Sequence, residues 1–331
     1  MSRLMPLRIA CIGCGFIGRR HMENAALMEG VVPAAYADAH LPAAEAFLAA
    51  FGGAYATTSA ARIFADPAID AVIIATHHDS HTPLALAAAA ARKHILLEKP
   101  MALTVEDCRT ISSAVAAAGI TLSINFKFRF APAAARARDA ITRPIATHGQ
   151  LAMPRMAGDI WVRDPIRGGG LILATACHVL DMVCWLNRAE PVRIYAESVP
   201  AMPENRHVDA VAATLRFAGG AVASLLLADA GEDLHAGKWL HEMFDGSRSA
   251  VLYDHFRQLR LSSPDEHFAA TDELRADGTW GVLEDFVRAV RTGTAPAIGA
   301  RDGLRATLLA SRLYDSLRRG APVEVVIDDA A

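Results

Sequence analysis

The sequence predicts an α/β fold that combines a parallel sheet in its first third with an antiparallel sheet further on. Up to about Ile124, short apolar runs alternate with segments of helical apolar spacing, which is the pattern of βαβ units. Beyond that point the runs are longer, and Gly219-Gly220 joins two of them as a hairpin turn would. Because 331 residues are many for one hydrophobic core, we expect two domains, residues 1–124 and 125–331.

Five apolar runs predict the strands of the parallel sheet: Leu7 to Ile12, Val31 to Ala37, Ala71 to Ala75, His94 to Leu97 and Ile120 to Ile124. Helical segments lie between these runs. One spans Arg19 to Met28, and another, Pro83 to Arg92, is rich in alanine, the residue that costs least in a helix. We therefore expect helices packed on a parallel sheet.

The second domain is predicted to contain a sheet with apolar residues on both faces. Its strands are Gly149 to Met156, Val192 to Val199, Val208 to Phe217 and Ala221 to Ala228, and two helices, around Leu283 to Val290 and from Arg301 to Arg318, close the chain. In the third strand one face is apolar, and the other carries alanines and Thr214 before its first charge at Arg216. Large exposed apolar patches are rare on monomers, so we expect a homodimer or homotetramer that buries one face of this sheet.

Composition excludes several classes of partner. The chain is 53% hydrophobic and 21% charged, as an ordinary soluble globular protein is. Its net charge of -3 and its scattered Lys and Arg give no basic patch for nucleic acid or an anionic membrane surface. Met1 to Arg8 lack a signal-peptide core, and the alanine-rich Leu84 to Ala91 is too short to cross a bilayer. We expect a cytoplasmic protein.

The five cysteines are an odd number without paired metal spacing. Cys11 and Cys14 formally make a CxxC motif, but both lie at the start of a glycine-rich turn. We therefore expect small buried thiols in preference to metal or redox chemistry.

That turn, Gly13-Cys14-Gly15-Phe16-Ile17-Gly18, follows the first predicted strand and opens the first predicted helix. The first glycine permits the turn, the second lets the main chain approach a pyrophosphate, and the third lets the helix pack on the strand. Unpaired N–H groups at the helix start attract the phosphates. An ordinary glycine turn could have the same residues, but the position between strand and helix favours a dinucleotide site.

Asp38 indicates which dinucleotide. It ends the second predicted strand, twenty residues after Gly18, where an acidic side chain can accept hydrogen bonds from a ribose 2′-OH. A carboxylate there would repel a 2′-phosphate, and no Arg follows it directly. The sequence therefore predicts NAD in preference to NADP.

Lys99 follows the strand His94 to Leu97, where ligands bind in open α/β sheets. Pro100 ends that strand and orients the turn, so Lys99 would point into the cleft. The alternative is a surface lysine before a turn.

Thr175, His178 and Asp181 fall at i, i+3 and i+6 of the helical segment Leu171 to Leu186, which follows three glycines, Gly168 to Gly170. They would share one side of that helix, where a carboxylate could orient the imidazole for proton transfer. A solvent-facing polar stripe is the alternative. The rest of the helix is strongly apolar, which favours a cleft.

His77 and His81 are spaced at i, i+4 and could hold a metal, but no HExxH pattern is present and we expect no metal site. Their loop would face the dinucleotide, which favours cofactor contacts, or capping of the next helix by Asp79 or Ser80. Trp161 and Arg163, before the three glycines, would reach the substrate or anchor the domain interface.

Together these segments resemble the glucose-fructose oxidoreductase / inositol dehydrogenase family (Gfo/Idh/MocA) over most of the chain. The matching pieces are the glycine turn, Ala75-Thr76 followed by His81, Leu96 to Ala102, Asn125 to Pro132, and Gly168 to Gly170 with His178 and Asp181. The resemblance implies an N-terminal Rossmann domain and a C-terminal α/β domain with an open, mostly antiparallel sheet. It also implies an NAD(P)-dependent dehydrogenase or reductase acting on CH–OH groups.

By this resemblance Lys99 is the catalytic or substrate-orienting lysine, Glu98 approaches the nicotinamide ribose, and His178 matches the active-site histidine. The expected cofactor contacts are Gly13, Gly15, Phe16, Ile17, Gly18, Asp38, Thr76, His77, His81, Glu98 and Lys99. The expected substrate contacts are Lys99, Trp161, Arg163, Thr175, His178 and Asp181. The chain departs from the family at Ala174, where many members have an aspartate, and at His77, where proline is frequent.

We therefore expect hydride transfer between NAD and a secondary hydroxyl of a sugar, inositol or glycoside, with Lys99 or His178 taking the hydroxyl proton. One alternative uses NAD transiently for elimination, epimerisation or deglycosylation, with no net NADH. The other is a non-catalytic NAD-binding regulatory protein, which Ala174 makes plausible.

Overall fold

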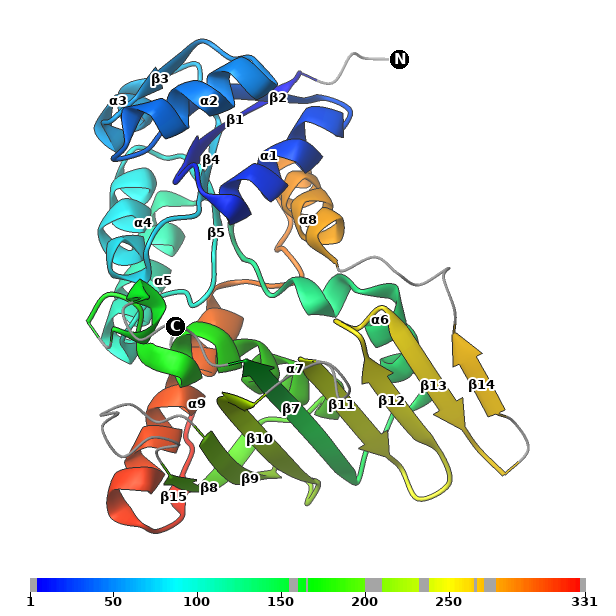
Figure 1. The fold of residues 1–331 in the computed structure, drawn as a ribbon. Helices are drawn as coiled ribbons and strands as arrows, with labels where there is room; N and C mark the ends of the chain where they lie inside the picture. Colours follow the sequence, from blue (N-terminus) through cyan, green and yellow to red (C-terminus); the bar gives the residue numbers. More distant parts are fainter. Residues whose placement is uncertain are drawn as a thin grey trace. The chain divides into compact units, whose positions relative to one another are not determined.

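The computed structural model describes residues 5–154, 160–164, 166–199, 210–231, 238–264, 267–270 and 278–327 (Figure 1). The chain divides into two compact units. The first runs to Asn125 and includes Thr279–Leu304, and the second comprises Phe126–Gly278 with the chain from Arg305 onward. Each unit has a sheet of its own.

The sheet of the first unit is parallel throughout, with the strand order β3-β2-β1-β4-β5-β6. Its strands are β1 (Leu7–Ile12), β2 (Val31–Ala37), β3 (Tyr55–Thr57), β4 (Ala71–Ile74), β5 (His94–Leu97) and β6 (Leu122–Ile124). Most of their side chains are buried, as in a sheet with both faces covered. The five predicted strands are confirmed, whereas β3 has an apolar run too short to predict.

Helices connect these strands: α1 (Phe16–Leu27), α2 (Leu41–Phe51), α3 (Ala60–Ala65), α4 (His81–Ala90) and α5 (Val105–Ala118). Helix α1 begins inside the glycine turn, before its predicted start, because the N–H of Arg19 already donates to the carbonyl of Gly15 at 3.0 Å. The alanine-rich α4 is helical as predicted. Thr104 caps α5 by accepting a 3.0 Å hydrogen bond from the N–H of Asp107.

Helix α8 (Thr279–Thr292) departs from the predicted domain division, which placed residues 125–331 together. In the structure α8 and the start of the next helix belong to the first unit. Helix α8 buries Val282, Leu283 and Phe286 and packs against α1, β5 and β6 (Figure 1). Apolar spacing predicts such a stripe, but it does not say which sheet the stripe will cover.

The second unit has a sheet of nine strands in the order β14-β13-β12-β11-β7-β10-β9-β8-β15. They are β7 (Ala146–Pro154), β8 (Pro191–Val199), β9 (Ala210–Phe217), β10 (Val222–Gly231), β11 (Trp239–Phe244), β12 (Ser249–Tyr253), β13 (Gln258–Ser262), β14 (His267–Ala270) and β15 (Val323–Glu324). All neighbours are antiparallel except β7 and β10, which are parallel. The open, mostly antiparallel sheet is therefore confirmed. Parts of two predicted strands, residues 155–156 and 208–209, lie outside the described residues.

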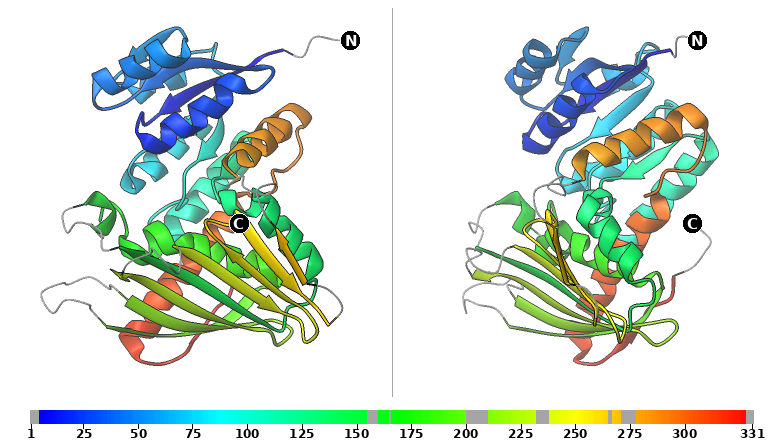
Figure 2. Two further views of the ribbon diagram at one scale, coloured as in Figure 1. Left: turned by 45° about the vertical axis from the view of Figure 1, so that its right-hand side comes forward. Right: turned by 90° about the vertical axis from the view of Figure 1, so that its right-hand side faces the viewer.

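Helices α6 (Pro132–Ala140), α7 (Cys177–Asn187) and α9 (Ala300–Arg319) lie on one face of this sheet, as Figure 2 shows. Only the part of α9 from Arg305 onward belongs to this unit. The predicted helix Leu171 to Leu186 is present, but its first turn, Ile172–Ala176, has π-helical hydrogen bonding. No described element covers the opposite face of the sheet (Figure 2).

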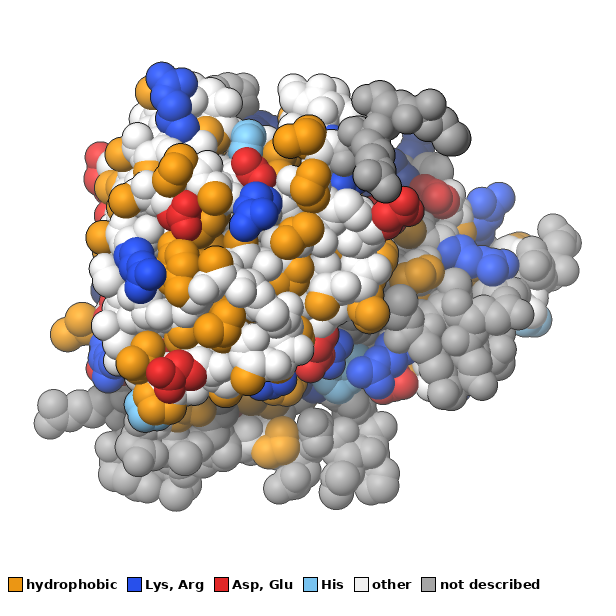
Figure 3. Space-filling model, turned by 90° about the horizontal axis from the view of Figure 1, so that it is seen from above, with side chains coloured by type: hydrophobic (Ala, Val, Ile, Leu, Met, Phe, Trp, Pro, Cys, Tyr) orange, Lys and Arg blue, Asp and Glu red, His pale blue; other side chains and the backbone are white. Residues whose placement is uncertain are grey.

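Surface charge and helix hydropathy are the features of the described residues that concern nucleic-acid and membrane partners. On the face seen in Figure 3, the described Lys and Arg side chains are interspersed with acidic and hydrophobic ones. Within the described ranges, no helix combines the length and hydropathy that a bilayer crossing requires.

Candidate cofactor and catalytic site

The glycine turn between β1 and α1 has the close contacts that the motif implies. Gly13 has a φ of +95°, and a Cβ there would lie 2.3 Å from the carbonyl oxygen of Ala75. A Cβ on Gly18 would lie 2.2 Å from the carbonyl oxygen of Gly13, so the third glycine lets helix and turn touch. Gly15 faces open space, and a ligand can approach the main chain there.

The start of α1 suits an anion. Gly15 is its N-cap residue and forms no side-chain cap, and the first turn carries no acidic side chain. Phe16 is 76% exposed and Ile17 is 40% exposed, so apolar surface lies beside the helix N-terminus. Free N–H groups at a helix start, on a helix of this length, attract phosphate.

Asp38 is held next to this turn. Its Oδ2 accepts a 2.8 Å hydrogen bond from the N–H of Cys14, and its Oδ1 accepts one of 2.9 Å from the N–H of His40. The side chain is half-buried at the end of β2, and each carboxylate oxygen has a further lone pair. The turn, the helix start and this carboxylate together fit a dinucleotide with an unphosphorylated ribose.

All five cysteines are buried thiols. A hydrogen bond with Cys14 and burial raise the pKa of Cys11 well above its usual value. This thiol is therefore unreactive, as the sequence led us to expect. Among the described residues, no group of three or more His, Cys, Asp or Glu side chains could hold a metal ion.

Glu98, directly after β5, lies in a buried hydrogen-bond network that the sequence did not reveal. Its Oε1 lies 2.8 Å from Nε2 of His21 and accepts a 2.5 Å hydrogen bond from Nδ2 of Asn125. Its Oε2 accepts a 3.2 Å hydrogen bond from the N–H of Lys99. Burial alone would raise the pKa of Glu98. The interactions with His21, the positive charge of Lys99 and the hydrogen bond from Asn125 instead lower this pKa to about 2. Glu98 is therefore ionised at neutral pH.

Sequence signals for His21 and Asn125 existed but were weak. His21 lies three residues after Gly18, on the side of α1 that a helical wheel turns toward the sheet. Asn125 directly follows β6, whose carboxyl end lies at the same sheet edge as that of β5. In both cases the sequence signal is a polar residue at a position that should face the sheet or its carboxyl edge.

His81 lies inside the first unit, next to the turn that follows Lys99. Its ring is fully buried, and Nδ1 lies 2.8 Å from the carbonyl oxygen of Pro100. Burial lowers the pKa of His81, so the neutral ring donates from Nδ1 to that carbonyl. This hydrogen bond holds the turn after Lys99, and the expected contact of His81 with the cofactor stays a prediction.

Thr76 and His77 remain half-buried at the end of β4. Oγ of Ser80 lies within hydrogen-bond distance of both residues, 2.6 Å from Oγ1 of Thr76 and 2.7 Å from the carbonyl oxygen of His77. Neither Asp79 nor Ser80 caps α4 through its side chain, because Ser80 is engaged in this way and Asp79 lies in the preceding short 3-10 helix, His78–Ser80.

In the second unit, His178 lies in an aromatic cage. Its ring centroid is 4.9 Å from that of Phe128, 5.6 Å from that of Trp239 and 5.9 Å from that of Phe126. The cage surrounds the imidazole with flat apolar walls and so limits its orientation.

Gly149 of β7 lets α7, which carries His178, lie close to the sheet. A Cβ at this glycine would lie 2.8 Å from Cγ1 of Val179 and 2.9 Å from Cγ1 of Val183. The height of His178 above the sheet therefore depends on the missing side chain of Gly149.

Asp181 is engaged by Arg129. Nε of Arg129 donates to Oδ2 at 2.8 Å, and Nη2 donates to Oδ1, so the ion pair is bidentate. Asp181 is only 2% exposed. A buried carboxylate with both oxygens bound to a guanidinium anchors the structure, and the expected contact of Asp181 with the substrate stays a prediction.

The remaining predicted substrate residues are also placed in the second unit. Thr175 is half-buried within the π-helical turn, so the expected i, i+3, i+6 stripe does not follow one α-helical face. Ala174 is buried in the same turn. Trp161 is half-buried, and Arg163 is buried with Nη2 3.4 Å from Oδ2 of Asp229. Lys99 belongs to the first unit.

Both parts of the chain are similar to known proteins. The profile of the oxidoreductase family with an NAD-binding Rossmann fold (GFO/IDH/MocA) matches residues 7–126, and that of the GFO/IDH/MocA C-terminal domain matches residues 133–231. The chain is 26% identical to the myo-inositol 2-dehydrogenase of Thermotoga maritima over 342 residues, which cover 97% of the chain and 100% of that protein. It is 36% identical to the 1,5-anhydro-D-fructose reductase of Ensifer adhaerens over 190 residues, 52% of this chain and 56% of that one.

A solved structure extends the likeness to both units. Levoglucosan dehydrogenase in complex with NADH and levoglucosan superposes with a TM-score of 0.89 and is 25% identical. The match covers 98% of this chain and 100% of that one.

Proposed function

The chain belongs to the GFO/IDH/MocA oxidoreductase family, and from this premise we propose that it transfers a hydride between NAD and a secondary hydroxyl of a sugar, inositol or glycoside. The observation that carries the proposal is the glycine turn with Asp38 fixed beside it, in a unit where Lys99 follows the carboxyl end of β5. Relatives named myo-inositol 2-dehydrogenase and levoglucosan dehydrogenase act on hydroxyls of this class.

The cofactor is assigned to residues of the first unit. The main chain of Gly13 to Gly18 and the start of α1 bind the pyrophosphate, and Asp38 accepts hydrogen bonds from the adenosine ribose. Thr76, His77 and Lys99 contribute to the rest of the pocket. Bound NAD supplies the hydride acceptor and donor chemistry.

Proton transfer is assigned to Lys99 or His178. The assigned group takes the proton of the reacting hydroxyl, since an alcohol can be oxidised only if its proton also leaves. The aromatic cage of His178 restricts the direction in which its imidazole can form a hydrogen bond. Thr175 and Trp161 contact the substrate. The small side chain of Ala174 determines which substrate fits beside them.

The test is turnover with a labelled substrate. Purified protein is incubated with NAD and a panel of inositols, aldoses and glycosides, each deuterated at the reacting carbon, and deuterium in NADH is measured by mass spectrometry. We expect label in NADH with at least one substrate. Conversion of a substrate without net NADH would favour transient redox chemistry, and NAD binding without conversion across the panel would favour a regulatory protein.

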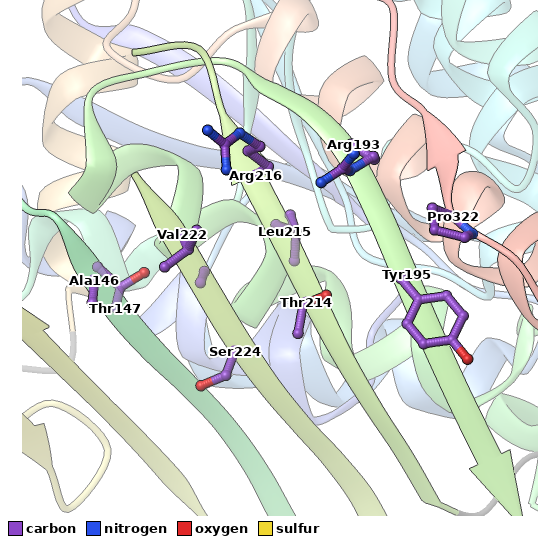
Figure 4. A pocket seen from close by; sticks show the side chains of 11 residues that line it. Ala146, Thr147, Arg193, Tyr195, Thr214, Leu215, Arg216, Val222, Ser224 and Pro322 are labelled. Carbon is purple, nitrogen blue, oxygen red and sulfur yellow. The ribbon is translucent and has the colours of Figure 1, made fainter. Parts of the chain in front are cut away.

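The open face of the second sheet is proposed to bind a second copy of the chain. Val222 is 45% exposed and Leu226 and Phe244 are each 40% exposed on that face. A hollow of about 610 Å³ lies between Arg193, Arg216 and Tyr195 (Figure 4). An exposed apolar patch with polar and charged side chains at its edge is typical of an interface between subunits.

Light scattering of Leu226→Glu tests this interface. We expect the variant to be monomeric and the wild type to be a dimer or tetramer. Leu27→Glu, on α1, is the matched control and should keep the wild-type mass, because Leu27 is exposed and belongs to the first unit, not to this sheet. A monomeric wild type would contradict the proposal. We also propose a cytoplasmic location, which accords with five buried free thiols.

A further inference from the structure

His21 is a fully buried histidine that has no role in the proposed reaction. It lies on α1, the helix that begins in the glycine turn. Its Nε2 lies 2.8 Å from Oε1 of Glu98, 77 positions further along the chain. Among the residues that the structure describes, the other ring nitrogen, Nδ1, has no hydrogen-bond partner. Nδ2 of Asn125 also lies 3.3 Å from Nε2, so the shorter contact with Glu98 is the main polar interaction of this buried imidazole.

Glu98 connects His21 to the main chain at Lys99. The carboxylate uses Oε1 for His21 and Asn125 and Oε2 for the N–H of Lys99. An ionised carboxylate in a buried site needs donors on both oxygens, because an unpaired buried charge is costly. Loss of the His21 donor would therefore shift Glu98, and with it the N–H that orients Lys99.

The same turn is held from its other side by His81. Nδ1 of His81 donates to the carbonyl of Pro100, the residue after Lys99. Lys99 is thus fixed at its N–H by one histidine, acting through Glu98, and at the following residue by another. Only the first of these histidines comes from the helix that begins in the glycine turn.

We propose that His21 is a positioning residue, which through Glu98 couples the cofactor-binding helix α1 to the orientation of Lys99. This inference rests on the proposed function, because it gives Lys99 a part in catalysis. It assigns His21 no contact with cofactor or substrate. A hydrogen bond inside a protein is electrostatically stronger than in water, so a donor on a helix can hold the Glu98 carboxylate in place.

The first experiment measures how Lys99 is presented, without any need for turnover. His21→Ala and the wild type are acetylated briefly with acetic anhydride, and each lysine is quantified by peptide mass spectrometry. The other lysines, Lys93, Lys127 and Lys238, are internal references. We expect severalfold faster acetylation of Lys99 in the variant and unchanged rates at the references. An unchanged rate at Lys99 in folded protein would overturn the proposal.

The second experiment is a double-mutant cycle on kcat with a substrate found by the panel. Misplacement of a catalytic group by about 1 Å can cost about 100-fold, so we expect His21→Ala to lower kcat by about 10- to 100-fold with little change in the Kd of NAD. In a Lys99→Ala background the same change should have almost no further effect, because its route is gone. Equal effects in both backgrounds would contradict coupling through Lys99.

Two further variants separate positioning from folding. Glu98→Gln keeps the size of the side chain and should also speed the acetylation of Lys99. If His21→Ala is unfolded, the acetylation rate in Glu98→Gln tests the proposal. His94→Asn is the matched control: Nδ1 of His94 accepts from the N–H of Thr121 at 3.0 Å, at the opposite end of the same strand β5. It should leave both the acetylation of Lys99 and kcat unchanged. If no substrate turns over, the proposed function fails and the acetylation result still decides the role of His21.

Discussion

Arg129 and Asp181 form a buried, bidentate ion pair that ties the segment Lys127–Phe130 to the helix bearing His178. Asp181 lies one helical turn after His178, so the pair fixes the helix beside the aromatic cage. We predict that Asp181→Ala destabilises the protein by about 3–5 kcal/mol, because the guanidinium loses its charged partner inside the protein. Urea unfolding measures the loss. A change below about 1 kcal/mol would show that the pair is dispensable.

The control for this prediction replaces both partners. Arg129→Met combined with Asp181→Leu removes the charges together and keeps apolar volume, so it should recover much of the stability lost by Asp181→Ala. Failure to recover would mean that packing, and not an uncompensated charge, causes the loss.

Lys99→Ala is expected to lower kcat by about 100- to 10,000-fold, the usual effect of removing a positioned proton-transfer group. The Kd of NAD should change far less. Steady-state kinetics with the deuterated panel substrate and calorimetric NAD titration provide both numbers. Lys93→Met is the control, because Nζ of Lys93 donates to the carbonyls of Asp66 and Ile69 and serves the fold. Near-wild-type turnover of Lys99→Ala would refute the assignment.

Asp38→Ser combined with Ala39→Arg should shift preference from NAD toward NADP. The carboxylate repels a 2′-phosphate, and an arginine in the next position would attract one. The measurement is the ratio of the Kd values for NAD and NADP. Ala39→Arg alone should improve NADP binding less, since Asp38 stays in place. An unchanged ratio in the double variant would count against ribose contact by Asp38.

His241 should make the second unit sensitive to acid. Burial, with a smaller effect of His148, lowers the pKa of His241 from 6.5 to about 3. Between these values the unfolded chain takes up a proton that the folded protein does not, so stability falls as pH falls from 6.5 toward 3. Each pKa unit of the difference corresponds to about 1.4 kcal/mol.

The variant His241→Leu tests this sensitivity. Its unfolding free energy, measured in urea at neutral pH and at about pH 4.5, should differ less between the two conditions than that of the wild type. His40→Leu removes an exposed histidine and is the control. The same acid sensitivity in His241→Leu and the wild type would show that other groups cause it.

Ala174→Asp should lower activity on the true substrate. Ala174 is 1% exposed in the π-helical turn, so a carboxylate there would be poorly solvated or would occupy space that the substrate uses. Rates across the panel of inositols, aldoses and glycosides are the measurement. Ala174→Asn has the same shape without the charge and separates the two effects. A general gain on simple polyols would contradict an altered substrate choice.

Local features of the sequence were sufficient for the cofactor turn and the parallel sheet. Gly13, Gly15 and Gly18 lie within one turn, and Asp38 ends the next strand, so their spacing alone implies their proximity. The strands β1, β2 and β5 were predicted at their observed bounds, because fully buried strands are continuous apolar runs. The strands β11 to β14 were not predicted. In β11 a polar residue, His241, occupies a buried position and breaks the apolar alternation.

Tertiary structure decided the contacts between residues far apart in the chain. His21 meets Glu98 across 77 positions, and Arg129 meets Asp181 across 52, so no periodicity could pair them. The same is true of α8, whose apolar stripe could have covered either sheet, and of β7, which pairs parallel with β10. Apolar spacing predicts which face of a helix or strand is buried, because that spacing depends only on residues close together in the sequence. The partner of that face depends on chain topology, which only the folded chain as a whole determines.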